Sequence, residues 1–152
     1  FKSISFDKSL CKEPVEAGSG KISVLLVEPN KYPKMIEIDD TLEAMQEVVG
    51  GDIEEYMPFE DEVAIICNEE GKVNGLTPNR AVYAENYREM QDIICGKFFI
   101  AYAPFEAERF QSLPPDLAEK YREKFKYPER FMRVNNEIIA VPFKPVRADK
   151  ER

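Results

Sequence analysis

Residues 22–28 (ISVLLVE) and residues 92–103 (DIICGKFFIAYA) are the two stretches that decide the fold. The first is almost continuously apolar and rich in β-branched residues, which is typical of a strand covered on both faces. The second predicts a long apolar strand. Gly96 interrupts the second stretch and predicts a bulge or an edge kink at that point. Residues 34–38 predict another strand, and the turn at residues 29–31 before it indicates a hairpin with residues 22–28.

Two helices are predicted from the residues at their ends. Residues 39–41 (DDT) predict the start of the first, because short oxygen-bearing side chains cap the free amides of the first turn. Gly50-Gly51 ends it, since glycine adopts the left-handed C-cap without strain. The apolar residues between them recur on one helical face, at Leu42, Met45, Val48 and Val49. The second helix begins at Pro114-Pro115, because proline is favoured at the first helical position, and ends before Pro128.

The remaining strands are predicted at residues 52–57 and 63–68, with a short return strand at residues 72–75. Residues 131–134 and 137–141 flank Asn135-Asn136, and this favours a type I′ hairpin because asparagine tolerates positive φ. Strands outnumber helices, and regular strand–helix alternation is absent. We therefore expect an α+β fold with a mixed, largely antiparallel sheet and two or three helices packed against it.

The chain has 152 residues, which predicts a single domain. We expect a flexible arm over residues 1–20, one α+β domain over residues 21–143, and a frayed, charged tail over residues 144–152. The longest apolar runs are too short to cross a bilayer, and none resembles a signal peptide. We therefore expect a cytoplasmic protein.

The sequence contains no histidine, which excludes catalysis by Ser-His-Asp or Cys-His arrangements and removes the commonest zinc ligand. Cys11, Cys67 and Cys95 show no CxxC spacing. Cys67 and Cys95 lie in apolar runs and are interpreted as buried free thiols, with a disulfide or a reactive thiol as the alternative. No nucleotide-binding motif occurs. We expect no enzyme, no cofactor and no metal; a pocket with carboxylates from two strands would favour an enzyme.

Charge is unevenly distributed along the chain. The formal net charge is −8, yet residues 37–70 hold 13 acidic residues and no lysine or arginine. The rest of the chain holds 16 acidic and 21 basic residues, a net charge of +5. The acidic block is interpreted as a solvated face, as a surface for a basic protein partner, or as a calcium or magnesium site, although no DxDxDG loop is present. The candidate protein-binding residues are Asp52, Glu54, Glu55, Glu60, Asp61, Glu62, Glu69 and Glu70.

Basic and aromatic residues alternate over residues 109–133, a composition that suits single-stranded nucleic acid through stacking and phosphate contacts. Leu117, Tyr121 and Phe125 are also explained as the core stripe of a helix with a charged outer face. The candidate nucleic-acid contacts are Lys120, Lys124, Lys126, Tyr127, Arg130 and Arg133.

Several short motifs together resemble a known family over about residues 21–103. They are Val27-Glu28-Pro29, Val49-Gly50-Gly51, Ile53-Glu54, Cys67-Asn68-Glu69-Glu70-Gly71, Pro78-Asn79-Arg80, and Gly96 before Phe98-Phe99-Ile100. The chain resembles an uncharacterised domain family carried by phages and by integrative or conjugative elements of Gram-positive gut bacteria. The resemblance implies an accessory gene of mobile DNA and supplies no catalytic residues.

These observations lead to two hypotheses. In the first, the chain is a non-enzymatic accessory protein of a mobile element that binds a host or element protein through its acidic surface; imitation of DNA to counter host defence is one form of this hypothesis. In the second, the chain binds nucleic acid through the basic and aromatic segment. The oligomeric state and the identity of the partner do not follow from the sequence.

Overall fold

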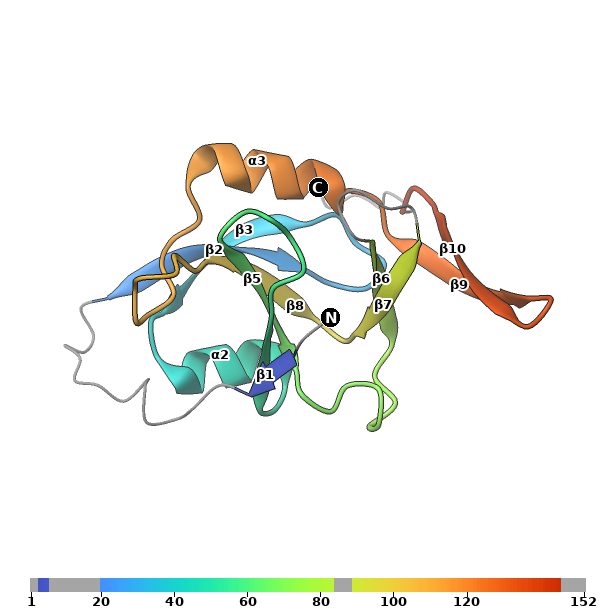
Figure 1. The fold of residues 1–152 in the computed structure, drawn as a ribbon, viewed down its shortest axis with the longest axis horizontal. Coiled ribbons are helices and arrows are strands. Elements are labelled where there is room, and N and C mark those ends of the chain that lie inside the picture. The colour runs from blue at the N-terminus through green and yellow to red at the C-terminus, as the bar shows by residue number, and fades with distance from the viewer. Residues whose placement is uncertain (1–2, 6–19, 84–88, 146–152) are drawn as a thin grey trace.

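A six-stranded sheet lies at the centre of the computed structural model, which describes residues 3–5, 20–83 and 89–145 (Figure 1). The strand order is β1-β4-β5-β8-β2-β3, and every neighbouring pair in this sheet is antiparallel. Its strands are β1 (Ser3–Ser5), β2 (Lys21–Val27), β3 (Lys34–Asp39), β4 (Ile53–Tyr56), β5 (Val63–Asn68) and β8 (Phe98–Tyr102). Strand β1 comes from the predicted N-terminal arm, whose remaining residues up to 19 lie outside the described part of the chain.

The two helices cover opposite faces of this sheet (Figure 1). Helix α2 (Leu42–Val49) packs on alternate residues of the central strands, which include Val24 and Ile66. Helix α3 (Pro115–Lys124) packs on the intervening residues, which include Leu25 and Ile65. Because successive strand residues point to opposite faces, an apolar strand with a helix on each side is buried throughout. This confirms the two-sided burial predicted for residues 22–28.

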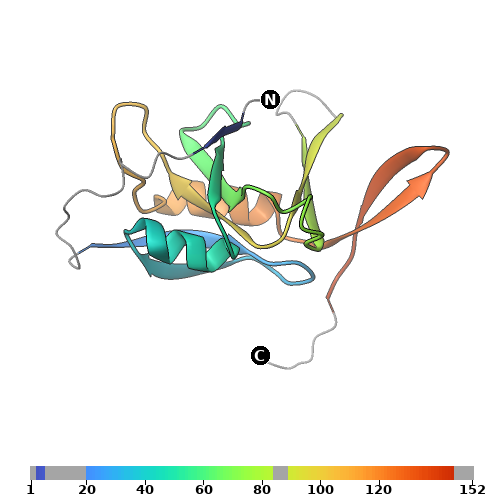
Figure 2. The same ribbon diagram turned by 90° about the horizontal axis from the view of Figure 1, so that it is seen from below.

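Two smaller sheets complete the described fold. Strand β6 (Pro78–Tyr83) pairs antiparallel with β7 (Met90–Cys95). Strand β9 (Glu129–Val134) pairs antiparallel with β10 (Glu137–Pro142), and this hairpin extends away from the rest of the molecule (Figure 2). Asn135 and Asn136 both have positive φ, at 52° and 70°, so the predicted type I′ turn is confirmed.

The α+β class is confirmed, but its details are corrected in three ways. All described strand pairings are antiparallel, so the sheet is not mixed. The strands form three sheets, and the described residues contain two helices. The predicted long strand at residues 92–103 is two strands of different sheets, because Gly96 has a φ of 88° and turns the chain between them.

The elements that were predicted correctly have capping or turn residues at their ends. Thr41 caps α2 by accepting a hydrogen bond from the amide of Ala44 at 3.1 Å, and Gly50 adopts the left-handed C-cap. The return strand predicted at residues 72–75 is wrong, because residues 69–75 form a turn. Part of that turn is closed by the amide of Leu76, which donates to the carbonyl of Gly71 at 2.9 Å.

In the described residues, no helix combines the length and apolar character that crossing a membrane requires.

Candidate functional site

A pocket of about 270 Å³ lies between β4, β5, β7 and the turn at residues 69–75. Strand β4 contributes Glu54 and Tyr56, which share a face because they are two residues apart. Strand β5 contributes Cys67, and β7 contributes Asp92 and Cys95. The pocket therefore lies where the six-stranded sheet meets the β6–β7 sheet.

The turn that closes the pocket is held by Asn68, whose side chain is buried. Its amide nitrogen donates to the carbonyl of Val49 at 3.1 Å, and its carbonyl oxygen accepts from the backbone amide of Glu70 at 2.8 Å. Gly71 lies directly against β7, since a Cβ atom at this position would be 2.6 Å from the carbonyl oxygen of Cys95. These contacts explain why the turn needs asparagine and glycine at these two positions.

Four acidic side chains line the pocket, namely Glu54, Glu69, Glu70 and Asp92. Burial raises the pKa of Glu54 above its usual value, and the nearby carboxylates of Asp92 and Glu69 raise it further. Asp92 forms an ion pair with Lys72 and also accepts from the backbone amide of Ile93 at 2.8 Å. Lys72 is the one basic residue among the described residues that line the pocket, so the pocket is negatively charged.

The two thiols that line the pocket are free. Burial raises the pKa of Cys67 to about 12, and it also raises the pKa of Cys95. Because the thiolate is the nucleophilic and metal-binding form, these shifts lower the reactivity of both thiols at neutral pH. The prediction of a buried free thiol is confirmed for Cys67, whereas Cys95 is free but only half-buried. Cys11 lies outside the described part of the chain. In the residues that the structure describes, no group of three or more histidine, cysteine, aspartate or glutamate residues could hold a metal ion.

A family model matches residues 22–126, which is more than half of the chain. The chain belongs to the DUF3846 family, a domain of unknown function. The comparisons with curated proteins and with solved structures gave no match. The matched residues include the whole pocket and α3, and they extend beyond the motifs over residues 21–103 that carry the sequence resemblance. The β9–β10 hairpin lies outside the match.

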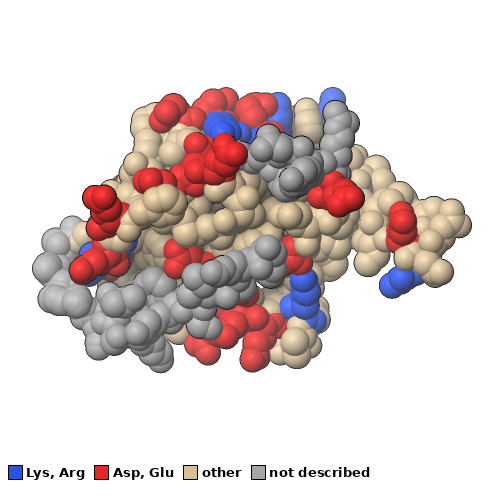
Figure 3. All heavy atoms as spheres, in the orientation of Figure 1, with Lys and Arg blue, Asp and Glu red and all other residues tan. Residues whose placement is uncertain are grey.

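The DUF3846 domain brings together three of the eight acidic residues predicted as a protein-binding surface: Glu54, Glu69 and Glu70. Asp52 instead accepts from the side-chain amide of Gln46 at 3.1 Å, and Glu55 lies on the opposite face of β4 from Glu54. Figure 3 shows acidic side chains in several separate groups on the face that it presents.

The other three predicted acidic residues, Glu60, Asp61 and Glu62, lie just before β5, whereas the pocket turn follows the end of β5. Asp61 accepts from Lys120 Nζ at 2.6 Å and from the hydroxyl of Tyr121 at 2.8 Å, and both contacts lower its pKa. Asp61 therefore contacts α3, and none of the three residues lines the pocket. The sequence does not predict Asp92 and Lys72 as site residues, because their meeting depends on how β7 packs against β5 and the turn that follows it.

The basic and aromatic segment at residues 109–133 of the DUF3846 chain does not form one surface, because its residues lie in the core, on α3 and on the hairpin. Tyr121 and Phe125 are buried in the core beneath α3, as the core interpretation predicts. Lys124 lies over the ring of Phe59, with Nζ 5.1 Å from the ring centroid, and Lys126 lies over Tyr127 at 5.3 Å. Arg130 and Arg133 belong to β9 and therefore to the projecting hairpin.

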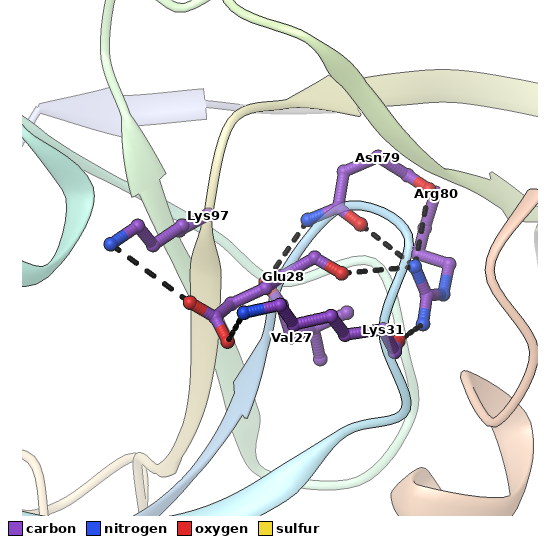
Figure 4. A network of polar contacts seen from close by, with 6 residues as sticks. All are labelled: Val27, Glu28, Lys31, Asn79, Arg80 and Lys97. Carbon is purple, nitrogen blue, oxygen red and sulfur yellow. Dashed lines mark hydrogen bonds and ion pairs between the residues drawn. The ribbon is translucent and has the colours of Figure 1, made fainter. Parts of the chain in front are cut away.

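A buried polar cluster around Asn79 and Arg80 positions the wall of the pocket formed by the β6–β7 sheet (Figure 4). Asn79 donates to the carbonyl of Val27 at 3.0 Å and to that of Gly96 at 2.9 Å. Arg80 donates to the carbonyl of Phe125 at 3.0 Å and to that of Lys31 at 2.8 Å. These bonds tie β6 to β2, to the β2–β3 turn and to the end of α3. No strand is predicted at Pro78-Asn79-Arg80, because proline and asparagine are typical of turns.

Proposed function

We propose that this chain is a non-enzymatic, cytoplasmic accessory protein of a mobile genetic element, and that its pocket binds a basic side chain of a protein partner. The observation that carries the proposal is the gathering of Glu54, Glu69, Glu70 and Asp92 around one concave site. A lysine or arginine side chain fits such a site, because its charge is attracted to the carboxylates and its carbon stem packs against apolar surface. Val73, Ile93 and Ile94 supply that apolar surface.

Glu54 and Asp92 come from two strands, an arrangement that also suits acid–base catalysis. The interactions of Asp92 favour binding over catalysis, because its carboxylate already pairs with Lys72 and accepts from the backbone amide of Ile93. Both thiols that line the pocket are protonated at neutral pH, and the chain contains no histidine. Binding of a cation requires none of these groups to transfer a proton.

The mobile-element context comes from the resemblance of the sequence to a family carried by phages and conjugative elements. Imitation of DNA would require carboxylates along a continuous surface. The separation of Glu54, Glu69 and Glu70 from Glu60 and Glu62 by the length of β5 favours local capture of a basic side chain instead.

The proposal is tested by measuring binding of fluorescent lysine-rich and arginine-rich peptides to the purified chain. We expect the double variant Glu54→Gln/Glu70→Gln to bind about tenfold more weakly, which corresponds to about 1.4 kcal/mol. The matched control is Glu60→Gln/Glu62→Gln, which removes the same charge at the other end of β5 and should change the affinity little. Equal weakening in the two variants would mean that overall charge, and not the pocket, attracts the peptide.

The same pair of variants can identify the partner. A host protein captured from lysate by the wild-type chain and by the Glu60→Gln/Glu62→Gln control, but not by the pocket variant, would be a partner of the pocket. Proteins captured by all three forms bind elsewhere.

Binding of nucleic acid is the second candidate function, and it is favoured by the basic residues Lys124, Lys126 and Arg133 near the end of α3 and on β9. Lys124 and Arg133 are exposed, and Lys126 is half-buried. A salt titration with single- and double-stranded DNA tests it, because phosphate contacts release counterions and weaken steeply with salt. We expect weak binding that is lost in Lys124→Gln/Lys126→Gln. Absence of binding at low salt would remove this candidate.

A further inference from the structure

The β9–β10 hairpin presents one fully exposed face to solvent. In an antiparallel pair, directly opposed residues share a face with residues two positions away. The face contains the opposed pairs Arg130–Val141, Met132–Ile139 and Val134–Glu137. All six side chains are exposed, and the four apolar ones have exposed fractions between 38% and 44%. We call these six residues the hairpin face.

This exposure requires a physical explanation. A two-stranded hairpin is at best marginally stable alone in water, because it has no second layer to cover its apolar side chains. The hairpin projects from the body of the molecule, so neither helix covers this face (Figure 2). On the opposite face, Phe131 and Ala140 are half-buried, and the pair Arg133–Ile138 next to the tip is exposed. Contiguous apolar surface of this kind on a protein typically marks an interaction site.

The order of charges along the hairpin face indicates its occupant. Arg130 lies near the base of the hairpin and Glu137 lies next to the tip, with Met132 and Ile139 between them. Two copies that pack face to face and run in opposite directions therefore place Arg130 of each chain beside Glu137 of the other. The Met132–Ile139 pairs of the two chains meet at the centre. Such a self-complementary face is what a two-fold symmetric interface requires.

We propose that the hairpin face binds the hairpin face of a second copy of this chain. The apolar centre and the acidic residue near the tip favour this occupant over nucleic acid, which would meet one arginine and one glutamate on this face. The surface is independent of the acidic pocket, which lies on other elements. Six residues per chain are fewer than the roughly 20 of a standard interface, so we expect a dimer that dissociates on dilution.

Sedimentation velocity over micromolar to near-millimolar concentrations tests the proposal. We expect a reversible monomer–dimer equilibrium for the wild-type chain and a monomer at all concentrations for Ile139→Lys. The matched control is Phe105→Lys, which places the same charge at a residue that is 75% exposed and belongs to neither the hairpin nor the pocket; it should dimerise like the wild type. Circular dichroism in the tyrosine region shows whether each variant keeps its fold. A wild-type chain that is monomeric throughout overturns the proposal.

Charge reversal tests the antiparallel arrangement directly. Arg130→Glu and Glu137→Arg should each weaken the dimer by about tenfold or more, because each places like charges in contact across the interface. The double variant Arg130→Glu/Glu137→Arg restores opposite charges and should recover the dimer. A double variant as weak as the single ones overturns the arrangement. The pocket variant Glu54→Gln/Glu70→Gln should dimerise normally, so that failure of the proposed pocket function and failure of this proposal can be told apart.

Discussion

Arg80 has no exposed surface, and its guanidinium is held by the backbone carbonyls of Glu28, Lys31 and Phe125, from two other segments of the chain, as well as by its neighbour Asn79. Burial lowers its pKa to about 10, and the nearby carboxylate of Glu129 opposes that shift. The side chain stays charged at neutral pH, because a pKa near 10 is still well above 7. A planar group with five donors can satisfy several carbonyls at once, which lysine cannot do with the same geometry.

We predict that Arg80→Met lowers the free energy of unfolding by about 2–5 kcal/mol, measured by urea denaturation. Methionine fills a similar volume, so the loss would come from the carbonyls of Phe125 and Lys31 that lose their donor. Arg122→Met is the matched control, because Arg122 lies on the exposed face of α3 and should change stability by about 0.5 kcal/mol or less. Similar losses in the two variants would contradict the role of Arg80 in the core.

The residues of this cluster also show a limit of sequence reasoning. Asn79 and Arg80 are polar and follow a proline, so neither periodicity nor hydropathy indicates that they are buried. Their burial is possible because carbonyls from distant segments meet at one point, which no local pattern reports. Leu42, Met45 and Val49 are the opposite case, because helical spacing alone placed them on the buried face of α2.

At the scale of elements, Gly96 decides whether residues 90–102 form one strand or two. Its φ of 88° lies in the left-handed region, and a Cβ atom there would approach the side chain of Leu76 to 2.7 Å. The chain thus leaves the β6–β7 sheet at Cys95 and enters the central sheet at Phe98.

We predict that Gly96→Ala destabilises the fold by about 2–3 kcal/mol, because it adds backbone strain and a contact with Leu76. Gly75→Ala separates the two causes. Gly75 also has positive φ, at 74°, but nothing lies within 4 Å of its added Cβ, so we expect a loss of about 1–2 kcal/mol from backbone strain alone. Thermal or urea denaturation checks both variants. Equal losses would mean that the contact with Leu76 costs nothing.

The elements predicted well are those with signals inside a few residues, such as Thr41 and Gly50 around α2, or Asn135 and Asn136 in the hairpin. The prediction of one continuous strand at residues 92–103 was wrong. Both halves of this stretch are apolar, so the sequence does not separate them, and the sheet that each half joins depends on partners far away in sequence. The same reason explains why the pocket was only partly predicted. Its acidic turn could be recognised in the sequence, whereas the approach of Asp92 and Lys72 is a result of tertiary packing.

At the scale of the whole molecule, the buried carboxylates predict how stability depends on pH. Burial raises the pKa of Glu54, Glu55 and Glu129 above 4.5 in the folded state. The folded chain therefore binds these protons more strongly than the unfolded chain does. The free energy of unfolding should rise as pH falls from neutral through the raised pKa values, until these residues also titrate in the unfolded chain near pH 4.5.

Further acidification should reverse the trend. Lys120 and Tyr121 hold the pKa of Asp61 below 3.8, so its stabilising contacts are present above that pH and are lost as the pH falls through the folded-state pKa. Urea denaturation between pH 7 and pH 3 would measure both the rise in the free energy of unfolding and its later decrease. Glu54→Gln/Glu55→Gln should flatten the rise, whereas Glu60→Gln/Glu62→Gln should keep it. A rise that is equally steep in the wild type and in both variants would contradict the assignment to Glu54 and Glu55.

The Asn79–Arg80 cluster has a consequence for how the molecule opens. Its hydrogen bonds join β6 to the end of β2, to the β2–β3 turn, to Gly96 and to Phe125, the residue that follows α3. If any of these segments separates from β6, a buried donor of Asn79 or Arg80 loses its hydrogen-bond acceptor, which costs free energy. The C-terminal end of α3, the β2–β3 turn and the β6–β7 sheet therefore form one cooperative unit, although they are dispersed along the chain.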